Sequence, residues 1–534
     1  MVEWENRSEG EISMPARKLK RITRFVLLLG SLFPLAAQSS YQAVSIPMRD
    51  GQQLAADFYP GRPFSRKPTI LIQTPYNKNL YRGLNPLFSP DKYHVVIVDL
   101  RGFYGSLAAA VPGYDLGLDG YDCVEWIAKQ AWSDGKIGTY GGSALGVIQF
   151  QTAKHAPPHL VCAMPAIGNF KRGYSNFYYG GVYRKENTES HSQFCDIPTV
   201  LSHPSQDDYW MSYEAENDYA DRIVVPMLLV SGWFDHFPAE VMRDFHDLKS
   251  NSDPSVRNRH KLVFGPWTHT GVNQIRQGQL LFPQAVGLVD QMTDEFFDLY
   301  LLGLPTGYES HPPIQFFQMG DNAWIATDDW YAYGGREGGL YLKPRGRLRR
   351  TSWPSTSAVS SFQYDPGNPA LSSEEGPWDI SELTEKRGDV LVFSSDVLNA
   401  PLKMQGGVGA VLFVSSSCPD TDFSVRLCDV YPDGRSLQMA QGIHRLRYRD
   451  SLSQPQLATP GQVYEVTVDL GELAMTFLPG HRLRLDITSS SYPKFEKNLN
   501  DGGPMYPPTG PGVVARNSLY QSILYPSGLV WEYH

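Results

Sequence analysis

The chain has few cysteines for its length, and this scarcity excludes a disulfide-rich scaffold. Its 534 residues include five, namely Cys123, Cys162, Cys195, Cys418 and Cys428. Their spacing matches no zinc-binding pattern. Cys418 and Cys428 are the closest pair in the sequence, and export would permit a disulfide between them. Cys123 and Cys162 are expected to be unbridged core residues.

Charge is also scarce, and positive charge is the scarcer sign. Charged residues make up 19% of the chain, with 47 Lys and Arg against 56 Asp and Glu, for a net charge of −9. Because nucleic acids are bound by clustered Lys and Arg, we expect no nucleic-acid partner. Small-molecule and peptide-like substrates stay open, and so does a homo-oligomer.

No hydrophobic run has the roughly 20 residues that a membrane-spanning helix needs. The run FVLLLGSLFPLAA (25–37) follows five basic residues between positions 17 and 24. A short apolar run with positive charge on its amino-terminal side is typical of a signal peptide. We therefore predict a signal peptide over residues 1–37, with Met14 as an alternative start. The mature protein is then expected to be secreted or periplasmic, without stable membrane insertion.

The chain changes its pattern near residue 313. From about 45 to 310, apolar runs such as HVVIVDL (94–100) and MLLVSGW (227–233) alternate with helix-like stretches, which is typical of a parallel sheet in an α/β fold. After 313, runs such as GAVLFVSS and HRLRLDITSS recur between turn residues. That second pattern favours an all-β jelly-roll sandwich over residues 313–534.

The segment 166–222 interrupts the α/β rhythm. It is rich in Tyr, Phe and Trp and has no strand periodicity. Insertions at the carboxyl ends of strands often build the site of such folds, so we predict a helical cap here. The α/β domain then comprises residues 38–165 and 223–312.

The stretch GTYGGSALG (138–146) places one serine among glycines, between a strand-like run and a helix-like one. Gly141 and Gly142 precede Ser143, and Gly146 follows it three positions later. Small residues at such positions let the backbones approach in a strained turn that exposes a nucleophile. The pattern is G-x-S-x-x-G, one position longer at its end than the usual G-x-S-x-G, and it predicts a nucleophile elbow.

A serine nucleophile needs a base, and the base needs an acceptor that fixes its tautomer. In α/β hydrolases the chain order is Ser, Asp or Glu, then His. Here Asp235 ends MLLVSGWFD and His269 ends KLVFGPWTH. His236 and His260 are alternative bases, but one adjoins Asp235 and the other begins a strand. We predict that Ser143, Asp235 and His269 are the catalytic residues.

The oxyanion formed during acyl transfer requires two hydrogen-bond donors. The backbone N–H of Ala144, directly after the serine, is the first candidate. Tyr76 follows the strand-like run TILIQ and could supply the second from its phenol, although a packed tyrosine is the alternative for that residue.

Aromatic residues at strand ends and in the cap are candidate walls of a substrate pocket. They favour an apolar or aromatic acyl group. The candidates are Trp233, Phe237, Trp267 and Tyr178.

Several ordered segments carry a family resemblance. They are PYNK, DLRGFYGS, DGYDCVEWIAKQAWSDGKIGTYGGSALG, GWFD, GPWTH and the tail segment PGHRLRLDITSSSYPKFEKNLNDG. Together they resemble the cocaine esterase / X-Pro dipeptidyl-peptidase family of serine hydrolases, the CocE/NonD group. The resemblance implies an α/β-hydrolase domain with an inserted helical cap and a C-terminal jelly roll. It also implies that Ser143, Asp235 and His269 form the triad, with Tyr76 and the Ala144 amide as the oxyanion hole.

The sequence departs from this family at positions that bear on the substrate. Ala144 stands where an aromatic residue is usual, which changes a wall of the acyl pocket. Phe237 and Pro238 stand where α-amino-acid ester hydrolases of the family carry acidic residues, which disfavours an α-amino acyl group. The short interval between Ser143 and Asp235 suggests a trimmed cap and a more open cleft.

These features predict an exported serine hydrolase that cleaves esters or amides through an acyl-enzyme, without metal or organic cofactor. X-Pro dipeptidyl-peptidase and β-lactam-type acylase activities are the alternatives within this class. A secreted binding module with an inactive hydrolase domain is the alternative of another class, disfavoured because no triad residue is missing. The acidic run PDTDFS could bind calcium, but acidic turns are more often only solvated.

Overall fold

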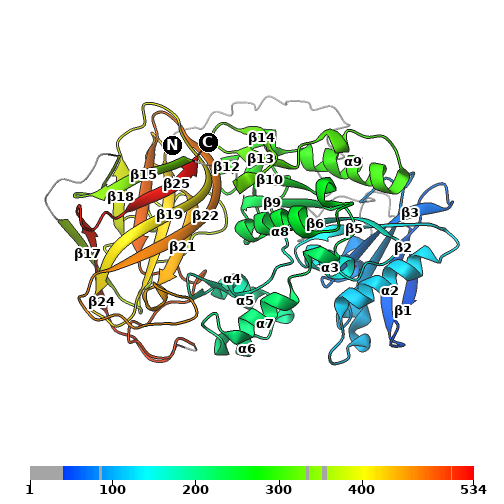
Figure 1. Ribbon diagram of the computed structural model, residues 1–534, viewed down its shortest axis with the longest axis horizontal. Helices are drawn as coiled ribbons and strands as arrows, with labels where there is room; N and C mark the ends of the chain where they lie inside the picture. Colours follow the sequence, from blue (N-terminus) through cyan, green and yellow to red (C-terminus); the bar gives the residue numbers. More distant parts are fainter. Residues whose placement is uncertain (1–39, 83–86, 332–335, 351–357, 507, 534) are drawn as a thin grey trace, which may run out of the picture.

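The computed structural model describes residues 40–82, 87–331, 336–350, 358–506 and 508–533. The predicted signal peptide, 1–37, lies outside the described residues. Two large β-structures lie beside each other, and a small helical region lies at the junction between them (Figure 1). Within the described ranges, no helix combines the length and apolar character that crossing a membrane requires.

The first β-structure is a ten-stranded sheet in the order β1-β2-β4-β3-β5-β6-β9-β10-β13-β14. All neighbours from β4 to β13 pair in parallel, and the outer pairings are antiparallel. The strands are β1 (Gln42–Pro47), β2 (Gln53–Tyr59), β3 (Lys67–Thr74), β4 (His94–Asp99), β5 (Ser133–Gly142), β6 (Leu160–Ala166), β9 (Leu228–Phe234), β10 (Lys261–Thr268), β13 (Ile314–Gln318) and β14 (Ala323–Thr327). Strands β4, β9 and β10 are buried along their whole length, as expected of parallel strands that are covered on both faces.

Four longer helices pack on this sheet (Figure 1). They are α2 (Leu116–Ala128), α3 (Ala144–Ala153), α8 (Pro238–Asn251) and α9 (Leu288–Leu302). A Cβ at Gly120 would lie 1.9 Å from Oγ1 of Thr152, so glycine at that position lets α2 approach α3 closely. This arrangement confirms the predicted α/β class.

The sheet continues past the predicted domain boundary at residue 313. Strand β13 pairs in parallel with β10, beginning at Leu262 opposite Ile314, and β14 pairs antiparallel with β13. The run PIQFFQ that we assigned to the jelly roll is therefore the ninth strand of the first sheet. It is apolar because it is covered on both faces, a property that sandwich strands and central sheet strands share.

The residues between β6 and β9 form the predicted helical cap. Its elements are α4 (Tyr174–Phe177), the hairpin β7 (Tyr178–Tyr179) and β8 (Val182–Tyr183), α5 (Lys185–Ser190), α6 (Ile197–Ser202) and α7 (Asp208–Glu216). Tyr174, Tyr178 and Trp210 are among the buried side chains that give the cap a small core of its own.

The cap is held against the second β-structure by hydrogen bonds. The Arg445 N–H donates to the Gly180 carbonyl oxygen over 2.9 Å, and the Tyr183 N–H donates to the Tyr506 hydroxyl over 2.8 Å. The Tyr448 hydroxyl donates to the Pro204 carbonyl oxygen over 3.0 Å. The cap is thus hydrogen-bonded to the second β-structure at Gly180, Tyr183 and Pro204.

The second β-structure is the predicted all-β sandwich. The described strands are β15 (Arg336–Lys343), β16 (Arg347–Arg349), β17 (Ala358–Tyr364), β18 (Leu391–Ser395), β19 (Leu402–Ser416), β20 (Asp422–Val430), β21 (Ser436–Arg445), β22 (Tyr464–Phe477), β23 (Arg482–Thr488), β24 (Ala515–Gln521) and β25 (Gly528–Tyr533). The longest ladder joins β19 to β22 and runs antiparallel from Leu402 opposite Phe477 to Val414 opposite Tyr464. In β19, buried and partly exposed residues alternate between Val408 and Val414, as in a strand with one face toward a core.

The two β-structures share one hydrophobic core. Buried residues of both belong to a single cluster that includes Phe316 and Met475. Met319, just after β13, forms a bridge with Met475 of β22, and the side-chain amide of Gln318 donates to Thr476 over 3.1 Å. The sandwich is therefore packed on the α/β domain and not merely tethered to it.

Two smaller sequence questions are answered in the sandwich. All five cysteines are free, so the bridge left open between Cys418 and Cys428 is not formed. In the acidic run, Asp420 pairs with Arg447 at 2.7 Å and Asp422 pairs with Arg445 at 2.8 Å. These carboxylates already have protein counterions.

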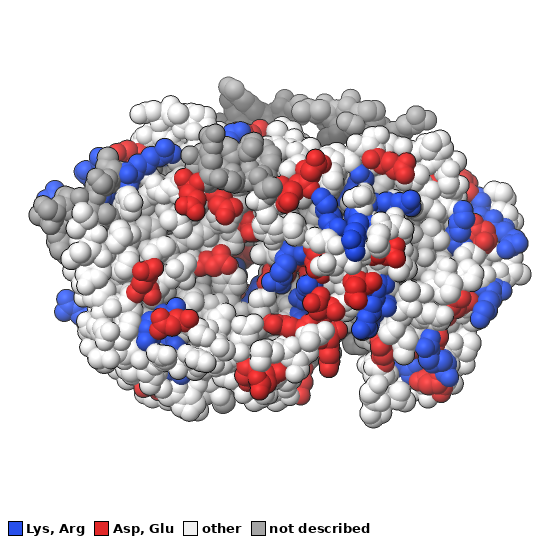
Figure 2. Space-filling model, in the orientation of Figure 1, with Lys and Arg blue, Asp and Glu red and all other residues white. Residues whose placement is uncertain are grey.

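Lys and Arg side chains lie among Asp and Glu side chains on the face of the molecule in Figure 2, so this face carries no single cationic patch in its described part.

Candidate active site

Ser143 occupies a strained turn between β5 and α3. Its backbone has φ 59° and ψ −126°, a conformation that non-glycine residues rarely adopt. Gly141 has φ +147°, and a Cβ there would lie 2.5 Å from Leu145 Cβ. A Cβ at Gly146 would lie 2.6 Å from the Ala166 carbonyl oxygen. Of the three predicted elbow glycines, Gly141 and Gly146 are thus required by close contacts, while Gly142 is the buried last residue of β5.

The structure brings the three predicted catalytic residues together. Asp235 directly follows β9 and His269 directly follows β10, so both lie at the same edge of the sheet as Ser143. His269 Nε2 is 2.9 Å from Ser143 Oγ, and His269 Nδ1 is 2.6 Å from Asp235 Oδ1. Because a carboxylate only accepts, Nδ1 carries the proton and Nε2 is free to accept from the serine.

Further hydrogen bonds fix the acid. The Ser231 hydroxyl donates to Asp235 Oδ2 over 3.0 Å, and the His236 N–H donates to Asp235 Oδ1 over 2.7 Å. Burial acts to raise the pKa of Asp235, but the charge and hydrogen bond of His269 outweigh it, so this pKa lies below its ordinary value. Asp235 is therefore ionised at neutral pH.

The same pairing acts on the base. Burial acts to lower the pKa of His269, but the charge and hydrogen bond of Asp235, with a contribution from Glu375, outweigh it and raise this pKa above 6.5. Burial, followed by the charge of His269, lowers the pKa of the adjacent His236 well below its usual value. Of the two imidazoles, only that of His269 is poised to take a proton near neutral pH.

Tyr76 and Ala144 lie beside the serine as predicted for an oxyanion hole. Tyr76 follows β3 at the same sheet edge and lines the same cavity as Ser143 and Ala144. Burial raises the pKa of Tyr76 above 10, and interactions with the Ser143 side chain and the Ala144 N–H oppose the rise. The phenol therefore keeps its proton at neutral pH and can donate it.

A cavity of about 360 Å³ opens over Ser143 and is closed on one side by the cap. It is lined by aromatic and aliphatic side chains from both the sheet edge and the cap, including Phe103, Ile148, Phe177, Phe194 and Phe237. Among the predicted pocket residues, Phe237 belongs to this lining.

The other three predicted pocket residues lie elsewhere, which corrects that prediction. Trp233 lines a separate cavity behind Asp235, and its indole N–H donates to the Phe317 carbonyl oxygen over 2.8 Å. Trp267 is wholly buried in the core, and Tyr178 lies in the core of the cap. Side chains alternate between the two faces of a strand, so the end of a strand does not decide which face its aromatic residues meet.

Glu375, a loop residue of the sandwich portion, reaches the site and was not predicted. Its Oε2 accepts from the His269 N–H over 3.2 Å, and its Oε1 lies 3.1 Å from His236 Nδ1. The His236 ring stacks on that of His269, with 4.4 Å between ring centroids. Burial, then the charge of Asp235, raises the pKa of Glu375 to about 7. No local pattern marks this residue, because its partner lies 106 positions away.

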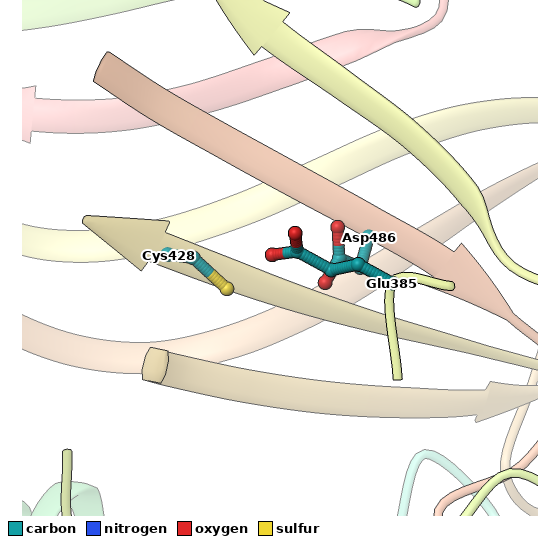
Figure 3. A group of neighbouring side chains, drawn as sticks. All are labelled: Glu385, Cys428 and Asp486. Carbon is teal, nitrogen blue, oxygen red and sulfur yellow. The ribbon is translucent and has the colours of Figure 1, made fainter. Parts of the chain in front are cut away.

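A second group of acidic residues lies far from this site, inside the sandwich. Oxygen or sulfur atoms of Glu385, Cys428 and Asp486 lie within 4.8 Å of one another (Figure 3). However, Arg484 donates to Glu385, and Arg426 stands opposite Asp486 on the neighbouring strand. Arg484 thus already balances Glu385, and burial raises the pKa of Asp486 to about 8, which keeps that carboxyl mostly protonated at neutral pH, so we assign no metal to this group.

Comparisons with known proteins agree over both parts of the chain. The model of the X-Pro dipeptidyl-peptidase (S15) family matches residues 50–197 and 191–271. The model of the X-Pro dipeptidyl-peptidase C-terminal non-catalytic domain matches residues 306–529. A cocaine esterase from Rhodococcus sp. (strain MB1 Bresler) is 32% identical over 553 residues, covering 89% of this chain and 93% of that protein.

Solved structures share the whole architecture. An aminopeptidase from a marine sediment Thaumarchaeota archaeon has a TM-score of 0.81 at 23% identity, covering 95% of this chain and 98% of its own. An α-amino acid ester hydrolase has a TM-score of 0.78 at 23% identity, covering 94% and 98%. With two family models and a 32% identical relative matching nearly the full length, the chain belongs to the cocaine esterase / X-Pro dipeptidyl-peptidase family of serine hydrolases.

Proposed function

We propose that the protein cleaves carboxylic ester or amide bonds through an acyl-enzyme formed on Ser143. The observation that supports this most directly is the continuous chain from Ser143 Oγ through His269 to Asp235, with distances of 2.9 and 2.6 Å. Such a chain converts a weakly nucleophilic hydroxyl into one that can attack a carbonyl.

In the acylation step, His269 takes the Ser143 proton at Nε2 while the serine oxygen attacks the carbonyl carbon. Asp235 stabilises the imidazolium that results. The Tyr76 hydroxyl and the Ala144 N–H then donate to the oxyanion of the tetrahedral intermediate. His269 returns the proton to the leaving alcohol or amine, and water repeats the sequence on the acyl-enzyme.

The cavity lining bears on the acyl group. In the described part of the chain, none of the residues that line the cavity is Asp or Glu. A substrate with a free α-ammonium group would find no carboxylate to balance its charge there. This favours esters and amides without that group over aminoacyl-prolyl peptides, although the family model keeps X-Pro dipeptidyl-peptidase activity as the second candidate.

The proposal is tested with purified protein in two assays. A fluorophosphonate probe is expected to label one serine, mapped by peptide mass spectrometry to Ser143, with no labelling of Ser143→Ala. A panel of p-nitrophenyl esters, p-nitroanilides and aminoacyl-prolyl anilides then ranks the bond types, with esters expected first. Turnover that survives in Ser143→Ala, or absence of turnover on every class, would contradict the proposal.

A further inference from the structure

The cavity over Ser143 contains one arginine side chain without an ion-pair partner among the described residues. Arg172 lines this cavity together with the aromatic ring of Phe177, and its guanidinium lies 5.8 Å from the centroid of that ring. Every other lining residue is neutral or a histidine. The cavity thus holds a fixed positive charge and no fixed negative charge.

Among the described residues, Arg172 forms no ion pair with the acidic side chains of its surroundings. A second cavity lies on its other side, where Asp218 pairs with Lys171 at 3.0 Å. Glu214, in that same cavity, accepts from the Tyr174 N–H over 2.9 Å. Lys171 also pairs with Asp247 at 3.0 Å. Lys171 therefore forms two ion pairs, whereas Arg172 forms none among the described residues.

The positive charge of Arg172 extends toward the catalytic cavity. Burial raises the pKa of the Cys195 thiol, and the charge of Arg172 opposes this rise. Cys195 belongs to the lining of this same cavity. A guanidinium group without an ion-pair partner can donate two parallel N–H hydrogen bonds to the carboxylate of a ligand in such a cavity.

Resting on the proposed function, we infer that Arg172 is a specificity residue that binds a carboxylate on the substrate, so that the preferred substrates are anionic esters or amides. The carboxylate could stand on the acyl chain or on the leaving group. Both place an anion in the same cavity, and paired substrates separate them.

The test compares pairs of matched aryl esters that differ in one charge. The acyl pair is the p-nitrophenyl half-ester of glutarate against p-nitrophenyl pentanoate, and the leaving-group pair is 4-acetoxybenzoate against phenyl acetate. The readout is the ratio of kcat/KM, anionic over neutral, within each pair. In Arg172→Gln we expect the ratio for one pair to fall by roughly 10- to 100-fold. Lys171→Gln, the matched control, should keep the wild-type ratio.

Two further measurements keep the inference separate from the proposed function. Arg172→Glu should reverse the preference toward an acyl chain that carries a quaternary ammonium group. Calorimetry on Ser143→Ala should show tighter binding of the intact anionic ester than of its neutral partner in the pair whose ratio depends on Arg172, and the added Arg172→Gln change should abolish this difference. Equal kcat/KM ratios and equal binding with and without Arg172 would overturn the inference, even if neutral esters are hydrolysed. If the protein hydrolyses no ester but still binds the anionic ester more tightly through Arg172, that result would count only against the proposed function.

Discussion

At the scale of single residues, the proposed mechanism makes the imidazole of His269 control the pH dependence. The base must be unprotonated to accept the Ser143 proton, and its pKa is raised above 6.5 mainly by Asp235 against the effect of burial. We therefore expect kcat/KM for a neutral ester to fall on the acid side, with an apparent pKa above 6.5. A profile from pH 5 to 9 measures this value, and a midpoint below 6 would contradict the assignment.

When it is ionised, Glu375, whose pKa is about 7, adds a negative charge next to this base and contributes to its raised pKa. In Glu375→Gln the remaining side-chain oxygen can still accept from the His269 N–H, but the charge is gone. The pKa of His269 should then fall, so the acid limb of kcat/KM should move to lower pH. Glu374→Gln is the control, because that neighbouring side chain is exposed. An unchanged acid limb in Glu375→Gln would mean that Glu375 has only a structural role.

Tyr76 offers a separate residue-scale test. Tyr76→Phe removes one oxyanion donor and leaves the ring and the Ala144 N–H in place, so kcat should fall by about 10²- to 10³-fold with a smaller effect on KM. Steady-state kinetics on an activated ester measure both constants. A loss that appears mainly in KM would show that the phenol contributes to substrate binding and not to the oxyanion.

At the scale of elements, the turn from β5 to α3 depends on glycine. In Gly146→Ala the added methyl group would meet the Ala166 carbonyl oxygen at 2.6 Å, so the start of α3 must shift. We expect a loss of stability of about 1–3 kcal/mol together with a loss of activity, because the shift also moves Ser143. Gly407→Ala is the control, since a Cβ there meets nothing within 4 Å. Thermal unfolding and ester turnover measure both effects.

Sequence patterns identified most elements of the α/β domain because its strands are short apolar runs that end at polar residues. Asp235 and His269 could be found for the same reason, since each directly follows a strand built from such a run. Strand β13 shows the limit of the method. Its apolar run fits a sandwich strand and a central parallel strand equally well, and only its pairing with β10 decides between them.

At the scale of the whole molecule, the ion pair between Arg445 and Asp422 fixes the edge of the sandwich on which the cap packs, since the Arg445 N–H also donates to the Gly180 carbonyl oxygen of the cap. Both side chains are about 2% exposed or less and form two contacts of 2.8 and 3.0 Å, while Arg445 also donates to Tyr506. Asp422→Asn leaves a buried cation unbalanced, so the free energy of unfolding should fall by about 3–5 kcal/mol. The exposed pair of Arg435 and Asp433 is the control, and Asp433→Asn should change the melting temperature little.

Contacts between distant parts of the chain could not be predicted from one sequence. No sequence motif marks Glu375 or Arg172. Folding brings Glu375 to the His269 backbone and Arg172 to the cavity over Ser143, and only these contacts indicate a role. The burial of Trp267 in the core could not be predicted for the same reason, because the exposure of a residue at a strand end depends on what packs over that strand.

The contact between Glu375 and the His269 backbone has a consequence for how this protein can be divided. A fragment that ends after β14 would contain Ser143, Asp235 and His269, yet the loop that carries the imidazole would lose its external brace, and the apolar face around Met319 would be exposed to water. The sandwich portion thus supplies a contact to the proposed active site, from Glu375 to the His269 backbone, in the way that a second subunit does in some enzymes.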